Sequence, residues 1–225
     1  MLYLVDTADI SCIKRVYDLY PIAGVTTNPT LLAKERADFW ETLHSIKKII
    51  GGEAMLHVQA VGTAAAEIVA EAEHLAAKIG GSLYVKIPVT AEGIKAIKLL
   101  KNRGIKTTAT AVFTPQQALL AAVAGADFVA PYINRLDNIC SDGVRVSGEI
   151  VRLFEVHGIP ARVLAASFKN IEQVHQASLA GCHAVTVSPE IIDMLVQHPL
   201  TDASVAQFIR DWEGFYGTGK LTTDV

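Results

Sequence analysis

Short apolar segments alternate with helix-forming segments along all 225 residues, and this alternation constrains the fold more than any other feature. Parallel strands need crossover connections, usually helices, and strands covered on both faces consist largely of Val, Ile and Leu. The pattern predicts eight strands, at residues 2–5, 22–26, 54–59, 82–87, 106–112, 126–131, 161–166 and 183–187. It predicts helices near residues 8–19, 30–50, 63–79, 91–103, 114–124, 144–157, 170–180 and 189–197.

Capping residues mark the ends of these predicted helices. Thr90 and the pair Thr114-Pro115 stand where two of them begin. Most end at a glycine just before the next strand, as left-handed helix caps commonly do: Gly51, Gly80, Gly104, Gly125, Gly158 and Gly181. Eight strand–helix units without a long linker favour an α/β protein of the (β/α)8 TIM-barrel class. A doubly wound open sheet is the alternative, but it usually has fewer units and a Gly-rich phosphate-binding turn, which this sequence lacks.

The length suits one domain, and we expect residues 1–225 to form a single barrel domain. Beyond the eighth unit, residues 201–213 predict an additional C-terminal helix, in which Val205, Phe208, Ile209 and Trp212 recur at helical spacing. Residues 214–225 follow as a tail.

The composition argues against several classes of protein. A net charge of −3 provides no basic surface for nucleic acid and no polybasic membrane patch. The three cysteines are widely spaced without a Cys-x-x-Cys motif, which indicates a reducing compartment. Asp6 and Asp9 interrupt any signal sequence, and no apolar run approaches the roughly 20 residues that span a bilayer. We therefore expect a cytoplasmic protein.

Lys86 lies inside the apolar run of residues 83–88, Leu-Tyr-Val-Lys-Ile-Pro. Burial disfavours the charged form of an amine, whose ordinary pKa of about 10.4 keeps it protonated at neutral pH. A neutral lysine amine is a nucleophile that can condense with a carbonyl group. The alternative is a lysine near a strand end whose ammonium group reaches the surface.

Polar side chains stand at the predicted exit of every strand. In (β/α)8 barrels the chemistry lies at the C-terminal ends of the strands. Here these positions hold Asp6, Thr26, Asn28, Gln59, Lys86, Thr108, Thr110, Tyr132, Arg135, Ser167, Lys169 and Ser188. Their convergence around one buried amine predicts an active site, with Ser188 interpreted as structural.

Several of these residues have plain structural alternatives. Asn28 could be only a turn former, Gln59, Thr108 and Thr110 ordinary strand residues, and Tyr132 a packed aromatic side chain. Asp6 could cap a helix that begins near Ala8, and Arg135 could pair with Asp137 or Asp142 at the surface. Other kinds of site find no support. The histidines lack the i, i+4 pairing of a helical zinc site, and no Gly-x-Ser-x-Gly motif of a serine hydrolase occurs.

Five segments in combination resemble the small transaldolase family, and the resemblance extends over essentially the whole chain. The segments are residues 5–8 (VDTA), 24–30 (GVTTNPT), 85–90 (VKIPVT), 130–135 (APYINR) and 165–169 (AASFK). In that family a lysine on strand four forms a Schiff base with the substrate, and Lys86 occupies that position. The family's other site residues carry over to Asp6, Thr26, Asn28, Thr110 and Ser167.

Two positions separate a transaldolase branch of the family from an aldolase branch. Transaldolases have glutamate at the end of strand three and phenylalanine after strand six, whereas this chain has Gln59 and Tyr132, like the fructose-6-phosphate aldolases. Glutamate can act as a base through water, but glutamine only orients water, so the tyrosine hydroxyl takes over proton transfer. Residues 28–35 and 198–202 are more similar to the transaldolase branch, and Thr108 matches neither.

The resemblance implies a class I aldolase that reversibly cleaves fructose 6-phosphate into dihydroxyacetone and glyceraldehyde 3-phosphate. Lys86 would form the Schiff base, and a water molecule held by Gln59, Thr110 and Tyr132 would move the proton of the C4 hydroxyl. The substrate hydroxyls would be held by Asp6, Thr26 and Asn28, with Thr108 nearby, and the phosphate by Arg135, Ser167 and Lys169. The alternative is a transaldolase that transfers the dihydroxyacetone unit between sugar phosphates such as sedoheptulose 7-phosphate and erythrose 4-phosphate.

The same resemblance implies partners that are small molecules, namely sugar phosphates and dihydroxyacetone, and neither nucleic acid nor membrane. It implies no metal or organic cofactor and a homo-oligomer, a decamer of two pentamers. Two other functions stay open. One is a sugar-phosphate isomerase in which Asp6 is the base and Lys86 acts only through its charge; the other is a non-enzymatic scaffold whose helix at residues 201–213 bridges subunits.

Overall fold

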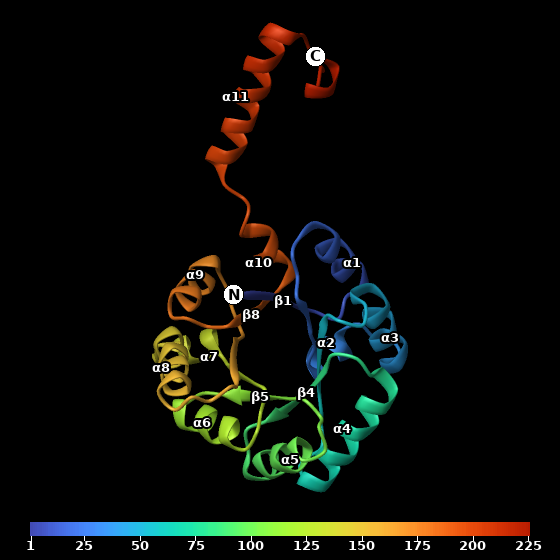
Figure 1. The fold of residues 1–225 in the computed structure, drawn as a ribbon, viewed down its shortest axis with the longest axis vertical. Helices are drawn as coiled ribbons and strands as arrows, with labels where there is room; N and C mark the ends of the chain where they lie inside the picture. The colour runs from blue at the N-terminus through green and yellow to red at the C-terminus, as the bar shows by residue number, and fades with distance from the viewer. The chain divides into compact units, whose positions relative to one another are not determined.

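The computed structural model describes residues 1–225 and contains a closed barrel of eight parallel strands in the order of the sequence. Figure 1 shows the ring of helices around the barrel. The strands are β1 (Leu2–Asp6), β2 (Gly24–Thr26), β3 (Met55–Gln59), β4 (Leu83–Pro88), β5 (Thr107–Val112), β6 (Phe128–Pro131), β7 (Arg162–Ala165) and β8 (Ala184–Val187). The predicted TIM barrel and all eight predicted strands are confirmed.

The helices follow the strands in alternation. They are α1 (Ile10–Leu19), α2 (Pro29–Lys34), α3 (Phe39–Ile50), α4 (Ala65–Ile79), α5 (Ala91–Lys101), α6 (Pro115–Val123), α7 (Ile133–Asp137), α8 (Gly143–Val156), α9 (Ile171–Leu179), α10 (Pro189–Met194) and α11 (Pro199–Tyr216), followed by the short 3-10 helix η1 (Thr222–Asp224). No helix is both long and apolar enough to cross a lipid bilayer.

Two helical regions differ from the prediction. The single helix predicted at residues 30–50 is two helices, because Arg36 takes a left-handed conformation (φ 52°) and Asp38 caps a new helix by accepting the Glu41 N–H. The short helix α7 was not predicted. It follows β6 directly, within a segment too short to show helical periodicity.

The predicted caps are formed. The Thr90 hydroxyl accepts the Gly93 N–H, and Thr114 forms a reciprocal capping box with Gln117. Gly51 has a positive φ of 77° and donates its N–H to the Lys47 carbonyl, which closes α3 before the chain turns into β3. The helix after β1 is capped by Asp9 and not by Asp6, so the capping alternative for Asp6 is wrong.

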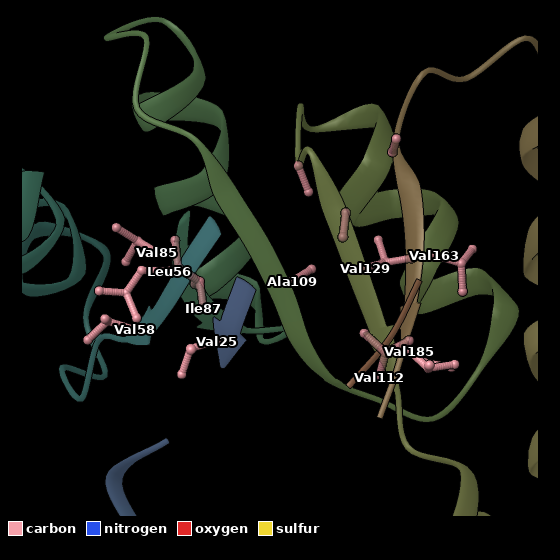
Figure 2. Close-up of a cluster of buried hydrophobic side chains, with 14 of the residues drawn as sticks. Val25, Leu56, Val58, Val85, Ile87, Ala109, Val112, Val129, Val163 and Val185 are labelled. Carbon is pink, nitrogen blue, oxygen red and sulfur yellow. The ribbon is translucent and has the colours of Figure 1, made fainter. Parts of the chain in front are cut away.

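The sheet separates two sets of apolar side chains. Residues on its outer face, among them Val25, Val85, Ile87 and Val163, pack against the surrounding helices, and Figure 2 shows side chains of this set from several strands. Inside the barrel, a smaller layer consists of Leu4, Phe128, Leu164 and Ala184, with Leu2, Ala23, Met55 and Tyr84 beside it. Further toward the C-terminal ends of the strands, the buried interior residues are polar, as at Thr26 and Lys86.

The chain divides into two compact units, Met1–Ile192 and Asp193–Val225. The first contains the whole barrel. In the second, α11 exceeds the predicted helix at residues 201–213 at both ends, and the His198 ring caps it by accepting the Leu200 N–H. The Trp212 indole donates to the Lys220 carbonyl over 2.8 Å, which ties the tail to the helix.

Candidate active site

A cavity of about 250 Å³ opens at the C-terminal ends of the barrel strands. Its walls come from seven strands or the segments that follow them, all but β3, so the closed sheet brings together residues far apart in the sequence. It is lined by Asp6, Thr26, Asn28, Leu31, Lys86, Thr108, Thr110, Ala130, Tyr132, Arg135, Leu164, Ala166, Ser167, Phe168, Lys169, Thr186, Val187 and Ser188. Every predicted site residue except Gln59 lines this cavity.

Gln59 lies at the end of β3 but lines a neighbouring pocket of about 340 Å³ instead. The pocket is largely apolar, with Leu32, Phe39 and Val61 in its walls. The Gln59 Cα is paired with that of Lys86 across β3 and β4, but no hydrogen bond joins the Gln59 side chain to the Thr110 or Tyr132 hydroxyl.

Lys86 is the buried amine of the cavity. Its neighbours Val85 and Ile87 are completely buried on the opposite face of β4, and Lys86 itself is only 7% exposed. The amine donates a hydrogen bond of 2.6 Å to the Thr27 carbonyl. Burial lowers the pKa of Lys86, and the negative charge of Asp6 partly opposes this shift. The surface-lysine alternative is wrong, because the strand holds this side chain inside the barrel.

Asp6 is the carboxylate that faces this amine. Burial raises the pKa of Asp6, while the charge of Lys86 and the hydrogen bond from Thr26 both act to lower it. The two shifts have one cause, since the same low-dielectric cavity disfavours the charged forms of both groups. Burial thus brings both groups closer to their neutral forms than water would, which suits a nucleophilic amine beside an acid–base carboxyl group.

A chain of hydroxyl groups supports Asp6. The Thr26 hydroxyl donates to the Asp6 carboxylate over 2.6 Å and lies 2.6 Å from the Thr186 hydroxyl. Because a hydroxyl has one proton, Thr26 must accept the hydrogen bond from Thr186 while it donates to Asp6. Thr186 lines the cavity but is absent from the residues predicted above. The available signal was its position two residues before Ser188, which places both side chains on one face of β8.

Tyr132 and Thr110 form a second hydroxyl pair, with 3.0 Å between their oxygens. The Arg135 guanidinium lies over the Tyr132 ring, 4.7 Å from its centroid. Asp137 and Asp142 accept backbone N–H groups, from Gly143 and Arg145 respectively, and neither forms an ion pair with Arg135. The guanidinium is therefore held at the cavity by α7 and by the aromatic ring.

Two residues with unusual backbone conformations flank the cavity. Ala111 has a φ of 55°, at a point where the pairing of β5 with β6 shifts register between Ala109 and Val112. Thr108 and Thr110 line the cavity by the ordinary alternation of a strand, and the bulge that follows them turns Val112, in place of Ala111, into the outer core. Ser167 has a φ of 63° and lies in the cavity wall. A left-handed non-glycine residue costs about 1–2 kcal/mol, and such strain is common at functional sites.

The mouth of the cavity is rich in anion-binding groups. Arg135, Lys169 and Ser167 all line it, and Arg135 and Lys169 carry positive charge. The Asn28 side-chain oxygen accepts the Leu31 N–H and so caps α2, which leaves its amide N–H groups as donors. A phosphorylated polyol matches this distribution of charge and polar groups. No group of three or more His, Cys, Asp and Glu side chains able to hold a metal ion is found.

The sequence of residues 3–218 matches the family described as Transaldolase/Fructose-6-phosphate aldolase. The chain belongs to this family. Curated relatives named "Probable transaldolase" include those of Geobacillus kaustophilus (42% identity over 94% of this chain and 98% of the relative), Clostridioides difficile (43%, 95% and 98%) and Brachyspira hyodysenteriae (42%, 96% and 100%).

Solved structures are similar in fold. A mandelate racemase/muconate lactonizing protein from Paracoccus denitrificans, complexed with magnesium, gives a TM-score of 0.57 at 14% identity over 83% of this chain and 54% of that protein. This chain thus spans about half of that protein's length. A designed cube-shaped protein cage gives a TM-score of 0.59 at 14% identity over 97% of this chain and 78% of that chain. At this identity the likeness shows the barrel fold alone.

The buried His57 ring should make the stability of the folded protein depend on pH. Its ring is completely buried, and burial, reinforced by the charge of Lys86, lowers the pKa of His57 to about 3. The unfolded chain therefore binds a proton here below about pH 6.5 that the folded protein does not bind until about pH 3, so acidification favours unfolding. Between about pH 7.5 and pH 5, we expect the free energy of unfolding to fall by about 2 kcal/mol more in the wild type than in His57→Phe.

Urea denaturation at each pH measures this difference. Asp6, whose raised pKa acts in the opposite direction, is present in both proteins and cancels in the comparison. The matched control is His157→Phe, since His157 is exposed. Parallel curves for the wild type and His57→Phe would contradict a neutral His57.

Proposed function

We propose that this chain is a Schiff-base enzyme that transfers a dihydroxyacetone unit between sugar phosphates, as a transaldolase does. The observation that carries the proposal is the buried Lys86 amine, whose pKa burial lowers, in a cavity with Asp6 at one side and cationic groups at its mouth. Gln59 and Tyr132 led us to expect simple cleavage. The relatives' name "Probable transaldolase" favours transfer instead.

The reaction begins when the Lys86 amine attacks the C2 ketone of a ketose phosphate and water leaves, which gives an iminium ion. The iminium accepts the electrons of the C3–C4 bond as that bond breaks, while the C4 hydroxyl loses its proton and becomes the aldehyde. The product that stays on Lys86 is an enamine of dihydroxyacetone. A second sugar aldehyde then adds to the enamine by the reverse steps, and hydrolysis of the new imine restores the amine.

The cavity provides groups for each step. Asp6, held by Thr26, and the Asn28 amide lie where they can bind the hydroxyls of the three-carbon unit. The Tyr132–Thr110 pair can hold the water molecule that moves the C4 proton, help that is typically worth about 10²–10⁴ in rate. Arg135, Ser167 and Lys169 bind the phosphate of either sugar at the mouth.

Cleavage to free dihydroxyacetone is the second candidate function, and the Tyr132 hydroxyl is the observation that favours it. Release of dihydroxyacetone requires that the enamine carbon gain a proton before another aldehyde arrives. A phenol hydroxyl in the cavity is a possible source of that proton. The ratio of transfer to cleavage therefore depends on Tyr132 and on how long the enamine survives.

The covalent step is testable by reduction. Borohydride added with dihydroxyacetone or fructose 6-phosphate should attach the three-carbon unit to Lys86, and peptide mass spectrometry identifies the modified residue. Lys86→Met should abolish the adduct and lower the activity at least about 10³-fold, since no other buried amine is available in the cavity. Full activity with an unmodified Lys86 would exclude the mechanism.

The choice between transfer and cleavage is testable with two substrates. Fructose 6-phosphate supplied with erythrose 4-phosphate should give sedoheptulose 7-phosphate in excess over free dihydroxyacetone, whereas fructose 6-phosphate alone gives only the slow release of dihydroxyacetone. Tyr132→Phe should raise the ratio of transfer to cleavage by about tenfold, because the enamine loses its proton donor. A ratio that Tyr132→Phe leaves unchanged would rule out this role for Tyr132.

We also propose that α11 joins copies of this chain into a homo-oligomer. None of the 18 residues of α11 is buried, although Val205, Phe208, Ile209, Trp212 and Tyr216 recur at helical spacing. Phe208 is 68% exposed and Ile209 is 53% exposed. An apolar stripe of this length is more typical of an interface between copies than of a surface in water.

Sedimentation velocity tests the assembly. The wild type should sediment as an oligomer, and Phe208→Asp should shift the population to smaller species because a charge would be buried in the interface. Ala203→Asp is the matched control, since Ala203 is exposed on α11 but lies outside the stripe. A monomeric wild type, or equal effects of the two substitutions, would count against this interface.

A further inference from the structure

An imidazole ring lies inside the barrel, one residue layer below the cavity. His57 is completely buried, and its ring stacks on Tyr84 with centroids 4.7 Å apart and planes 10° apart. The Phe128 ring meets it edge-on at 5.4 Å. An apolar ring could fill this space without leaving buried polar atoms, so the presence of an imidazole needs a further reason.

The one polar contact of this ring leads to the cavity. His57 Nδ1 lies 2.9 Å from the Thr108 hydroxyl oxygen, and this hydroxyl makes no other hydrogen bond. Thr108 lines the cavity, and its Cα is paired with that of Lys86 across β4 and β5. The Thr108 hydroxyl therefore lies between a buried histidine and the strand position that carries the amine.

The other ring nitrogen decides the direction of this hydrogen bond. His57 Nε2 is buried and has no hydrogen-bond partner. An N–H group buried without an acceptor is among the rarest arrangements in folded proteins, whereas an unsatisfied acceptor is tolerated more often. The proton of the neutral ring accordingly belongs on Nδ1, from which it is donated to the Thr108 oxygen.

We propose that His57 is a positioning residue that makes Thr108 a hydrogen-bond donor to an oxygen of the ketose bound at Lys86. Because the Thr108 oxygen accepts from His57, its own proton is directed to another acceptor, and the cavity is where an acceptor can arrive. The proposal rests on the proposed function, since it assigns Thr108 to the ketose that forms the Schiff base. It explains a polar pair, His57 and Thr108, that the mechanism above leaves without a role.

The charge state of His57 supports this arrangement. Burial and the nearby Lys86 keep the ring neutral, because they lower the pKa of His57 to about 3. A neutral ring with the proton on Nδ1 can only donate to Thr108. The orientation of the Thr108 hydroxyl therefore stays the same at any pH at which the amine can act.

The tautomer can be observed directly in the unaltered protein. Two-bond ¹H–¹⁵N correlation spectra of the histidine-labelled wild type distinguish protonation at Nδ1 from protonation at Nε2, and the signals that disappear in His57→Phe identify the residue. If His57→Phe does not fold, the signals that shift in Thr108→Val serve instead. We expect the proton on Nδ1, and a ring protonated on Nε2 would overturn the proposal.

A double-mutant cycle tests the effect on catalysis. His57→Phe keeps the aromatic volume and Thr108→Val keeps the shape of threonine, so each removes one partner of the hydrogen bond. We expect each to lower kcat/KM for the ketose by about tenfold while KM for the aldehyde stays unchanged, and the double variant to be no worse than Thr108→Val. His57→Asn, which can again donate to Thr108, should recover part of the loss. If the losses of the two single variants multiply in the double variant, the two residues act independently, and this result would overturn the proposal.

Trapping at Lys86 separates the failure of this inference from the failure of the proposed function. If borohydride labels wild-type Lys86 but the double-mutant cycle shows no coupling between His57 and Thr108, the Schiff-base function is supported and the proposed role of His57 is wrong. If Lys86 is never labelled, the proposed function fails. A wild-type tautomer with the proton on Nε2 then overturns the orientation of Thr108 independently of any activity.

Discussion

A lysine amine and a carboxyl group are held together inside the barrel, where neither is well hydrated. Burial disfavours both charged forms and lowers the pKa of Lys86 while it raises that of Asp6. Each group also offsets part of the other's shift through its charge. The outer core makes this arrangement possible, because Val85 and Ile87 fix β4 against the helices and leave the Lys86 side chain no route to the surface.

Much of the surrounding structure serves to satisfy these two groups. The Thr27 carbonyl accepts from the amine, and Thr26, itself held by Thr186, donates to the carboxylate. Buried polar groups with partners cost far less than buried groups without them. The polar layer thus consists of several short hydrogen-bonded groups above an apolar layer, and the His57–Thr108 pair extends hydrogen bonding down into the apolar one.

The strained backbone positions lie at the same edge of the barrel. Ala111 and Ser167 take left-handed conformations where β5 and β7 reach the cavity, and the bulge at Ala111 changes the side-chain alternation of β5. Neither position holds glycine, which would adopt these conformations at lower cost. The strained conformations at Ala111 and Ser167 lower stability, and they occur where Thr110 and Ser167 line the cavity wall. Backbone strain of this kind is typical of functional sites.

The sequence by itself determined the eight strands, the glycine helix ends, the barrel class and nearly all polar residues of the cavity, because hydrophobic periodicity, caps and strand exits are local signals. The break at Arg36, the helix α7 and the bulge at Ala111 were decided by tertiary packing, since propensity over so few residues is weak. Only the closed barrel could show that the Gln59 side chain is not hydrogen-bonded to the Thr110–Tyr132 pair, that Thr186 supports Asp6 through Thr26, and that His57 contacts Thr108 across the interior. Those relations join residues from different strands, and the distances between them exist only once the sheet has closed.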